Sequence, residues 1–225
     1  MAAAAFAVPG TRVYMRWVLA EENGPVELLT FLFLFAGGVL GLSLAARARR
    51  LRLGWWTVAF YCAFGLGFLL VGMEEIAWGH WFFHWKTPAF WRELNRQGET
   101  TLHNISGIQG HTELFRIAFA AGGLIGIWCA RLPSFAAVAA PAILAPLFLV
   151  IGVHSSIDLI LDYAAPDSLL EKAFTRTSEL VEMYVAFGGW AYLRLNSRRL
   201  AQLGARTSTA PVSDGARPSK RAGLG

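Results

Sequence analysis

The residues of this sequence best suited to chemistry are carboxylates and imidazoles that recur at the ends of apolar segments. Glu74 and Glu75 are adjacent at the end of one such segment. His154 and Asp158 lie one helical turn apart at the end of another, and Glu182 precedes a third. Ionisable groups at the boundary of a bilayer are costly to bury unless they pair, hold a proton or bind a metal. Their recurrence predicts an acid/base or metal-binding site.

We predict a catalytic set that combines these segments with the loop between them: Glu74, Glu75, His103, His154 and Glu182. Zinc and iron centres need three or more carboxylate or imidazole ligands, and we expect four residues to converge on such a divalent metal: Glu75, His103, His154 and Glu182. The rotation of each helix decides which neighbour points inward, so the reserve ligands are Glu99, His111, Asp158 and Glu179. The alternative to a metal site is a structural ion pair between Glu182 and Arg116.

No motif in the sequence names a reaction. The His-Glu-x-x-His pattern of zincins, the Glu-x-x-His pair of di-iron bundles, the Gly-x-Ser-x-Gly turn and a phosphate-binding glycine loop are all absent from the sequence. Cys62 and Cys129 both lie inside apolar runs, so we expect them to be packing residues. The sequence therefore predicts where a site lies and leaves its reaction open.

The elements that position these residues follow from an apolar composition. Of 225 residues, 55% are hydrophobic and only 16% are charged, which excludes an ordinary cytosolic enzyme. Uncharged runs cover residues 28–46, 53–73 and 132–153, and each is close to the ~20 residues that a membrane-spanning helix needs. Two shorter uncharged runs cover residues 117–130 and 183–193.

The basic residues decide how many of these runs cross the membrane. They cluster after the first run, at Arg131 and after the last run, and they share one side only if all five runs cross. The positive-inside rule makes that side cytoplasmic. We therefore predict an all-α integral membrane protein, a five-transmembrane-helix bundle with its N-terminus out and its C-terminus in. The bundle comprises residues 26–197, with spans at about 26–46, 54–77, 112–131, 134–156 and 178–196.

Three further segments flank or interrupt this bundle. Residues 1–25 are predicted as an N-terminal outer segment, and residues 198–225 as a disordered basic cytoplasmic tail. Residues 80–110 are rich in Trp and Phe, which favour the headgroup layer, so they are predicted as an interfacial segment. Within this segment, Thr87-Pro88 begins and Gly98 ends an amphipathic interfacial helix over 88–97. The five histidines and nearly all the acids then lie on the outer face.

The end of the second span and the outer segment carry motifs in three places: Glu74-Glu75-Ile76-Ala77-Trp78-Gly79, Thr87-Pro88, and Asn95-Arg96-Gln97-Gly98-Glu99 followed by Leu102-His103-Asn104. On these residues the chain resembles a family of uncharacterised bacterial multipass membrane proteins, which tend to read Glu-Glu-Ile-Ser-Trp-Gly-Gln-Arg, then Thr-Pro, then Asn-x-Gln-x-Glu-x-x-Leu-His-Asn. This chain departs from that pattern at Ala77, His80 and Trp81. The resemblance implies a shared site that includes Glu74, Glu75, Glu99 and His103.

Two function classes fit these features. In the first, the protein is an outer-leaflet enzyme whose carboxylates and histidines hold a metal, or act as acid and base, on a lipid or other hydrophobic substrate. In the alternative, it is a non-catalytic membrane subunit or assembly factor of a larger membrane complex. A proton-coupled carrier is a third class, although the sequence lacks the internal repeat that many carriers show.

The expected location is the bacterial cytoplasmic (inner) membrane. Membrane lipids are the expected partners, together with a membrane protein if the non-catalytic alternative holds. The net charge of +5 comes from basic residues that cluster beside the spans, so nucleic acid is not an expected partner.

Overall fold

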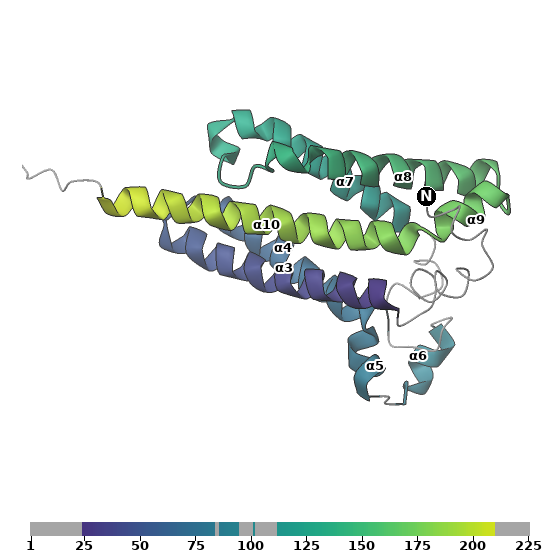
Figure 1. Ribbon diagram of the computed structural model, residues 1–225. Coiled ribbons are helices and arrows are strands. Elements are labelled where there is room, and N and C mark those ends of the chain that lie inside the picture. The colour runs from purple at the N-terminus through teal and green to yellow at the C-terminus, as the bar shows by residue number, and fades with distance from the viewer. Residues whose placement is uncertain (1–23, 84–85, 95–100, 102–111, 210–225) are drawn as a thin grey trace, which may run out of the picture.

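The structure is a computed structural model that describes residues 24–83, 86–94, 101 and 112–209, and all regular elements in these ranges are helices (Figure 1). Five long helices run side by side: α3 (Pro25–Arg50), α4 (Trp55–Glu75), α7 (Thr112–Trp128), α8 (Ala145–Ala164) and α10 (Ser178–Thr209). Short helices connect them: η1 (Ala77–Gly79), α5 (His80–Phe83), α6 (Ala89–Leu94), η2 (Cys129–Arg131), η3 (Pro133–Phe135), η4 (Ala142–Leu144) and α9 (Leu169–Thr175).

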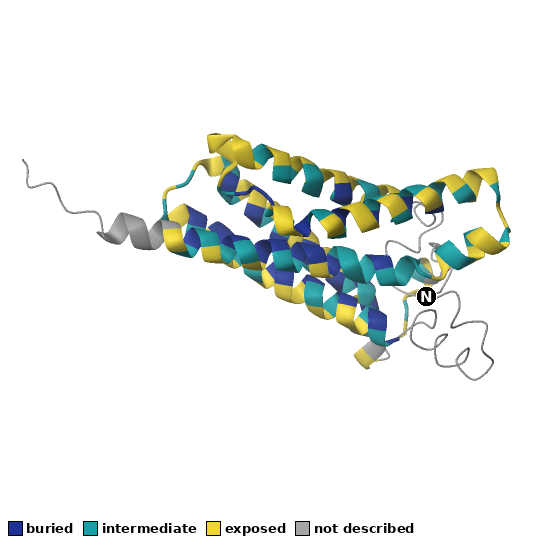
Figure 2. Ribbon diagram, turned by 45° about the horizontal axis from the view of Figure 1, so that its top comes forward, coloured by how far each residue is buried: buried dark blue, intermediate teal, exposed yellow. Residues whose placement is uncertain are grey.

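The protein is a multipass membrane protein by the length and composition of its helices. Four helical segments are long and apolar enough to cross a bilayer: Pro25–Arg50, Trp55–Glu75, Thr112–Arg131 and Ala142–Ala164. Their outward faces carry exposed apolar side chains such as Leu66, Trp128 and Ile160, which are 54%, 59% and 62% exposed. Such faces suit a hydrocarbon solvent and not water. Figure 2 shows the buried positions gathered inside the bundle.

The bundle consists of two helical hairpins with α10 between them. α3 packs on α4, α7 packs on α8, and α10 contacts α3 along its length and α8 near its beginning (Figure 1). α3 and α4 approach so closely that a Cβ on Gly65 would lie 2.8 Å from the backbone nitrogen of Leu42 and 2.9 Å from the carbonyl oxygen of Gly38. Small residues at such a crossing permit backbone contact between helices in a membrane.

The fourth apolar run is not a helix over its whole length, which corrects the predicted span at 134–156. Residues 133–141 form short turns, and the continuous helix α8 begins at Ala145 and extends to Ala164. Proline accounts for the shift. Pro141 disfavours helical backbone at the residue before it, whereas Pro146 lies in the first turn of α8, where its missing N–H is no loss.

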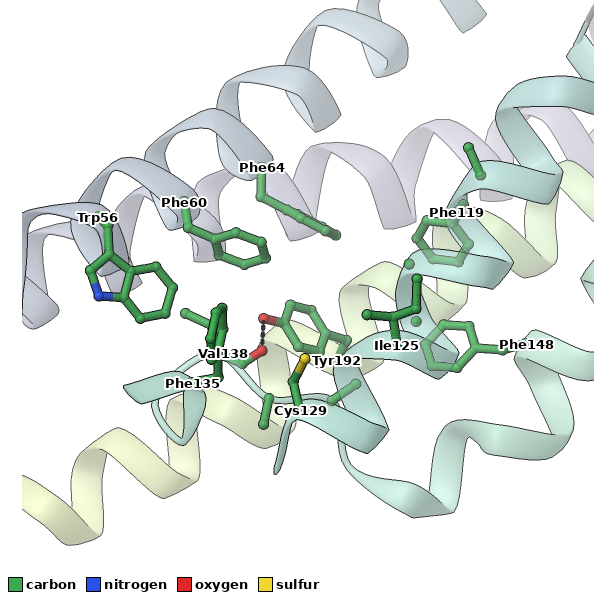
Figure 3. A pocket seen from close by; sticks show the side chains of 16 residues that line it. Trp56, Phe60, Phe64, Phe119, Ile125, Cys129, Phe135, Val138, Phe148 and Tyr192 are labelled. Carbon is green, nitrogen blue, oxygen red and sulfur yellow. Dashed lines mark hydrogen bonds between the residues drawn. The ribbon is translucent and has the colours of Figure 1, made fainter. Parts of the chain in front are cut away.

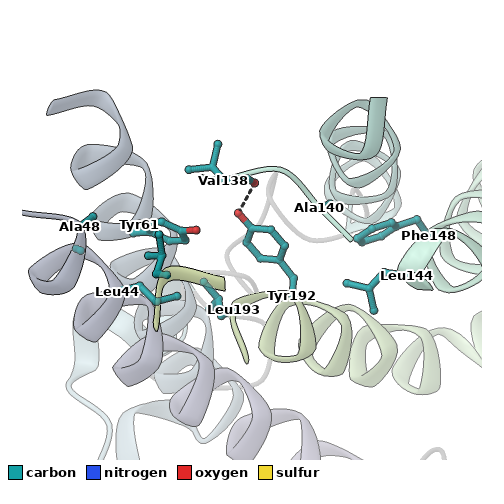
Figure 4. Packing of buried hydrophobic residues seen from close by; sticks show 11 residues of the cluster. Leu44, Ala48, Tyr61, Val138, Ala140, Leu144, Phe148, Tyr192 and Leu193 are labelled. Carbon is teal, nitrogen blue, oxygen red and sulfur yellow. Dashed lines mark hydrogen bonds between the residues drawn. The ribbon is translucent and has the colours of Figure 1, made fainter. Parts of the chain in front are cut away.

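Residues 136–139 turn back into the bundle, and their carbonyl groups receive hydrogen bonds from distant side chains. These bonds run from Tyr61 to Ala137 (2.5 Å), from Tyr192 to Val138 (2.7 Å; Figure 4), and from Arg199 to Ala136 (3.0 Å) and Ala139 (3.2 Å). Buried backbone carbonyl groups outside regular helices must find partners elsewhere in the protein. Val138 and Ala140 consequently join the largest apolar core, with Leu44 and Leu193, and Ala139 is also buried.

The structure also bears on the predicted interfacial helix and on the predicted C-terminal tail. α6 lies inside the predicted interfacial helix over 88–97, whose last residues fall outside the described part of the chain. α10 continues to Thr209, so the predicted disordered tail at 198–225 is wrong for residues 198–209. Residues 210–225 lie outside the described part of the chain, and so do residues 1–23 of the predicted outer segment at 1–25.

Candidate functional site

Acidic side chains from all five long helices lie at one end of the bundle, which we call the carboxylate end. It comprises the beginnings of α3, α7 and α10 and the ends of α4 and α8, with the acids Glu27, Glu74, Glu75, Glu113, Asp158, Glu179 and Glu182 (Figure 1). The opposite, arginine end carries Arg47, Arg49, Arg50, Arg52, Arg131, Arg194, Arg198 and Arg199. The predicted segregation of the two charges is present in the fold.

Arg116 is the centre of an ion-pair network that joins α7, α8 and α10. Its Nη2 lies 3.1 Å from Glu113 Oε1 and 3.0 Å from Asp158 Oδ2. Its Nη1 lies 4.0 Å from Glu182 Oε1 and donates a 3.4 Å hydrogen bond to the carbonyl oxygen of Ser178. Arg116 is only 3% exposed. The guanidinium therefore fixes three helices relative to one another at the carboxylate end.

The packing of α8 explains why Asp158, and not a more exposed acid, reaches Arg116. Ile151, Ser155 and Asp158 follow a helical spacing and are all at most 2% exposed, so they share the inward face of α8. Asp162, one turn further, is exposed. The sequence prediction held Asp158 only as a reserve ligand, whereas the structure makes it a direct partner of the buried cation.

The adjacent pair Glu74 and Glu75 divides between two environments. Glu74 is buried and accepts a 2.5 Å hydrogen bond from the indole nitrogen of Trp78. The chain turns sharply after α4, with positive φ angles of 44° at Ala77 and 55° at Trp78, and this turn returns the indole to Glu74. Glu75 is partly buried and lies within electrostatic reach of Glu27, Glu179 and Glu182, which belong to α3 and α10.

His154 is directed toward the junction of α9 and α10. Its Nε2 lies 2.8 Å from Thr177 Oγ1, and its ring packs against Phe174 with a centroid separation of 4.8 Å. The positive charge of Arg116 also acts on the imidazole. Thr177 was not among the predicted site residues. Thr177 is uncharged and lies outside the apolar runs, so no signal in the sequence could have identified it.

The structure brings together some of the predicted site residues. Glu182 lies 4.0 Å from Arg116, the charge of Glu182 acts on Glu75, and the charge of Arg116 acts on His154. Among the described residues, no group of three or more His, Cys, Asp and Glu side chains is arranged to hold a metal ion. His103, with the reserve residues Glu99 and His111, lies outside the described residues, so the four-residue metal set stays a prediction. The ion pair between Glu182 and Arg116, which was the predicted alternative, is present.

Comparison with protein-family models, with curated proteins and with solved structures gives no match for this chain. The functional argument consequently depends on the geometry of the carboxylate end.

Proposed function

We propose that the carboxylate end is the acid/base site of a membrane enzyme that acts on a lipid or another hydrophobic substrate. The observation that carries this proposal is the buried Arg116, which pairs with Glu113 and Asp158 and lies 4.0 Å from Glu182 on α10, whose charge in turn acts on Glu75 of α4. Carboxylates that share a site at a membrane boundary are typical of proton transfer, since one can accept a proton while the other holds one. Glu75 and Glu182 are the proposed acid and base.

Arg116 is the proposed positioning residue. Glu113 and Asp158 hold one side of its guanidinium at 3.1 and 3.0 Å, and the other side faces Glu182. A cation fixed in this way also stabilises negative charge that develops on a nearby substrate atom. Two buried atoms of the network, Glu113 Oε2 and Arg116 Nε, have no hydrogen-bond partner within the described part of the chain.

The aromatic side chains of α5 and α6 support a hydrophobic substrate. Phe82, Phe83 and Phe90 are 56%, 73% and 67% exposed, and their helices follow directly from the end of α4 that carries Glu75. Exposed aromatic rings of this kind favour the headgroup layer of a membrane. A site held at that depth is accessible to lipids and to other molecules that partition into the bilayer.

The proposal includes a topology and a cofactor. We place α10 as a fifth span, with the N-terminus out and the C-terminus in, in the bacterial cytoplasmic membrane. A divalent metal, zinc or iron, is proposed only with His103 as a ligand beside Glu75, His154 and Glu182. The motifs at residues 74–104 support a shared site with the family of uncharacterised bacterial multipass membrane proteins that the chain resembles.

The second candidate function is a non-catalytic membrane subunit or assembly factor. It is favoured by one observation: the helices of the bundle themselves supply the partners of Arg116. An ion-pair network of this kind is what a purely structural role would require.

The test is the turnover of membrane lipids by the purified protein. Wild type in detergent is incubated with total lipids extracted from the membranes of its expression host, and the products are measured by mass spectrometry. Glu75→Gln and Glu182→Gln should abolish turnover, whereas Glu171→Gln, on α9, should leave it unchanged. Zinc, iron and manganese are measured in wild type, Glu182→Gln and His154→Ala. Absence of turnover and of metal in wild type, with all variants folding normally, would favour the structural role.

A further inference from the structure

A cavity of about 390 Å³ separates α4 from α7. Trp56, Phe60 and Phe64 of α4 face it from one side, and Ile125 of α7 and Cys129 of η2 face it from the other (Figure 3). α4 makes its main contacts with α3, and α7 makes its main contacts with α8, so this is the seam between the two hairpins. Both helices that border the seam are candidate membrane spans, so hydrocarbon is the solvent at its opening.

The lining of the cavity suits a hydrocarbon chain. Its polar side chains are few, and Tyr192, one of them, donates its hydroxyl to the carbonyl oxygen of Val138 (Figure 3). Along α7 the lining extends from Ala118 to Cys129, a distance of about 16 Å at the helical rise per residue. This length is about half of the ~30 Å hydrocarbon core. One acyl chain of one leaflet therefore matches the cavity in length.

Gly122 preserves the space on the α7 side. It lines the cavity, and a Cβ added to it would have no heavy atom within 4 Å. The neighbouring Gly123 differs, because a Cβ there would lie 2.5 Å from the ring of Phe148. A side chain at position 122 would thus enter the cavity without disturbing the packing of α7 on α8.

Exposed arginines flank the end of the cavity where Trp56 and Cys129 lie. Arg131 follows Cys129 by two residues, and Arg52 precedes Trp56 by four, and both arginine side chains are exposed. Guanidinium groups bind phosphate through paired hydrogen bonds. Basic side chains between membrane helices, beside a hydrocarbon-lined opening, are typical of sites for anionic lipids.

We propose that the cavity between α4 and α7 holds one acyl chain of an anionic phospholipid, whose phosphate binds at Arg131 and Arg52. The lipid fills the seam between the hairpins at the arginine end of the bundle. This site is separate from the acid/base site at the carboxylate end and does not depend on it.

The test uses photoreactive lipids in phosphatidylcholine vesicles that contain the full-length protein. Phosphatidylglycerol and phosphatidylcholine probes carry the same diazirine in one acyl chain, and mass spectrometry locates the labelled residues. The phosphatidylglycerol probe should label the half-buried lining residues Phe64, Phe119 and Cys129 several-fold more than the lipid-facing Leu66 and Leu70. It should exceed the phosphatidylcholine probe roughly fivefold for each arginine that contributes, the preference expected of one basic residue beside an anionic headgroup.

Two matched variants separate this site from general contact with the bilayer. Gly122→Leu should remove most of the labelling in the cavity. Gly67→Leu should leave it unchanged, because a Cβ at Gly67 also meets open space but Gly67 does not line the cavity. Arg131→Gln should lower labelling by phosphatidylglycerol toward that by phosphatidylcholine.

Three results of the labelling experiment would overturn the proposal. The first is equal labelling by both lipids, and the second is labelling of the cavity residues no stronger than that of Leu66 and Leu70. The third is unchanged labelling in Gly122→Leu. The melting temperatures of the two leucine variants are compared first, as a control for folding. Native mass spectrometry of retained lipid then gives a second measurement that does not need the photoreactive group. Gly122→Leu should then lose the phospholipid that wild type and Gly67→Leu retain, and retention by all three would also overturn the proposal.

Discussion

Replacing Arg116 by methionine should strongly destabilise the bundle. The change removes the cation beside two buried carboxylates, because Asp158 is 2% exposed and Glu113 is 8% exposed. Removing one partner of a buried ion pair costs about 3–5 kcal/mol, since the remaining charge stays buried without compensation. The two contacts at 3.0 and 3.1 Å account for this figure, whereas Glu182 is 4.0 Å away and more exposed and adds little.

The assay is unfolding of the protein in mixed detergent micelles with increasing dodecyl sulfate, followed by tryptophan fluorescence. Lys172→Met is the control, because Lys172 and Asp167 are 3.6 Å apart and their side chains are 50% and 92% exposed. An exposed pair of this kind contributes less than about 1 kcal/mol. The double variant Arg116→Met/Asp158→Leu should be more stable than Arg116→Met alone, because it removes a carboxylate that the single variant leaves uncompensated.

Either of two results would refute this reasoning. One is an Arg116→Met variant that is as stable as Lys172→Met. The other is a double variant whose loss of stability equals the sum of the two single losses, because independent sites add and coupled partners do not.

Three further predictions concern packing, backbone pairing and topology. Gly65→Ala should destabilise the protein by about 1–3 kcal/mol in the same unfolding assay, because its methyl group would lie 2.8 Å from a backbone nitrogen of α3, while Gly67→Ala should be neutral; equal effects would contradict the close contact of α3 and α4. Tyr192→Phe should cost about 1–3 kcal/mol, because it leaves the carbonyl of Val138 without its donor; a stability equal to that of wild type would show that the bond is dispensable. In intact cells, an impermeant maleimide applied from outside should label Lys172→Cys and spare Arg50→Cys in a background without Cys62 and Cys129, and the reverse pattern would invert the proposed topology.

The sequence was sufficient to predict most of the helices, because uncharged length and flanking charge determine where a chain crosses a bilayer. The predicted span at 112–131 matches the segment from Thr112 to Arg131. The span at 134–156 was misplaced, because hydropathy does not distinguish a helix from an apolar stretch that folds back under the control of Pro141 and Pro146. The side chains that satisfy this stretch come from α4 and α10, far away in the sequence.

The candidate site was predictable in depth but not in detail. Charge patterns placed Glu75, His154 and Glu182 at one end of the bundle, where the structure has them. Which of Glu74 and Glu75 is buried depends on the rotation of α4, and the turn that brings the indole of Trp78 to Glu74 has a positive φ that no spacing rule predicts. Likewise, Asp158 takes precedence as a partner of Arg116 because of the rotation of α8, which is set by packing against the rest of the bundle.

The hydrogen bonds that fix residues 136–139 have a consequence for the order in which the protein assembles. During synthesis, Tyr61 leaves the ribosome before this stretch, but Tyr192 and Arg199 leave after it. Until the last helix is inserted, three of the four carbonyl groups have no protein donor. α10 is therefore the closing member of the assembly, because a chain that ends before Tyr192 lacks the side chains that bind the carbonyl groups of Ala136, Val138 and Ala139.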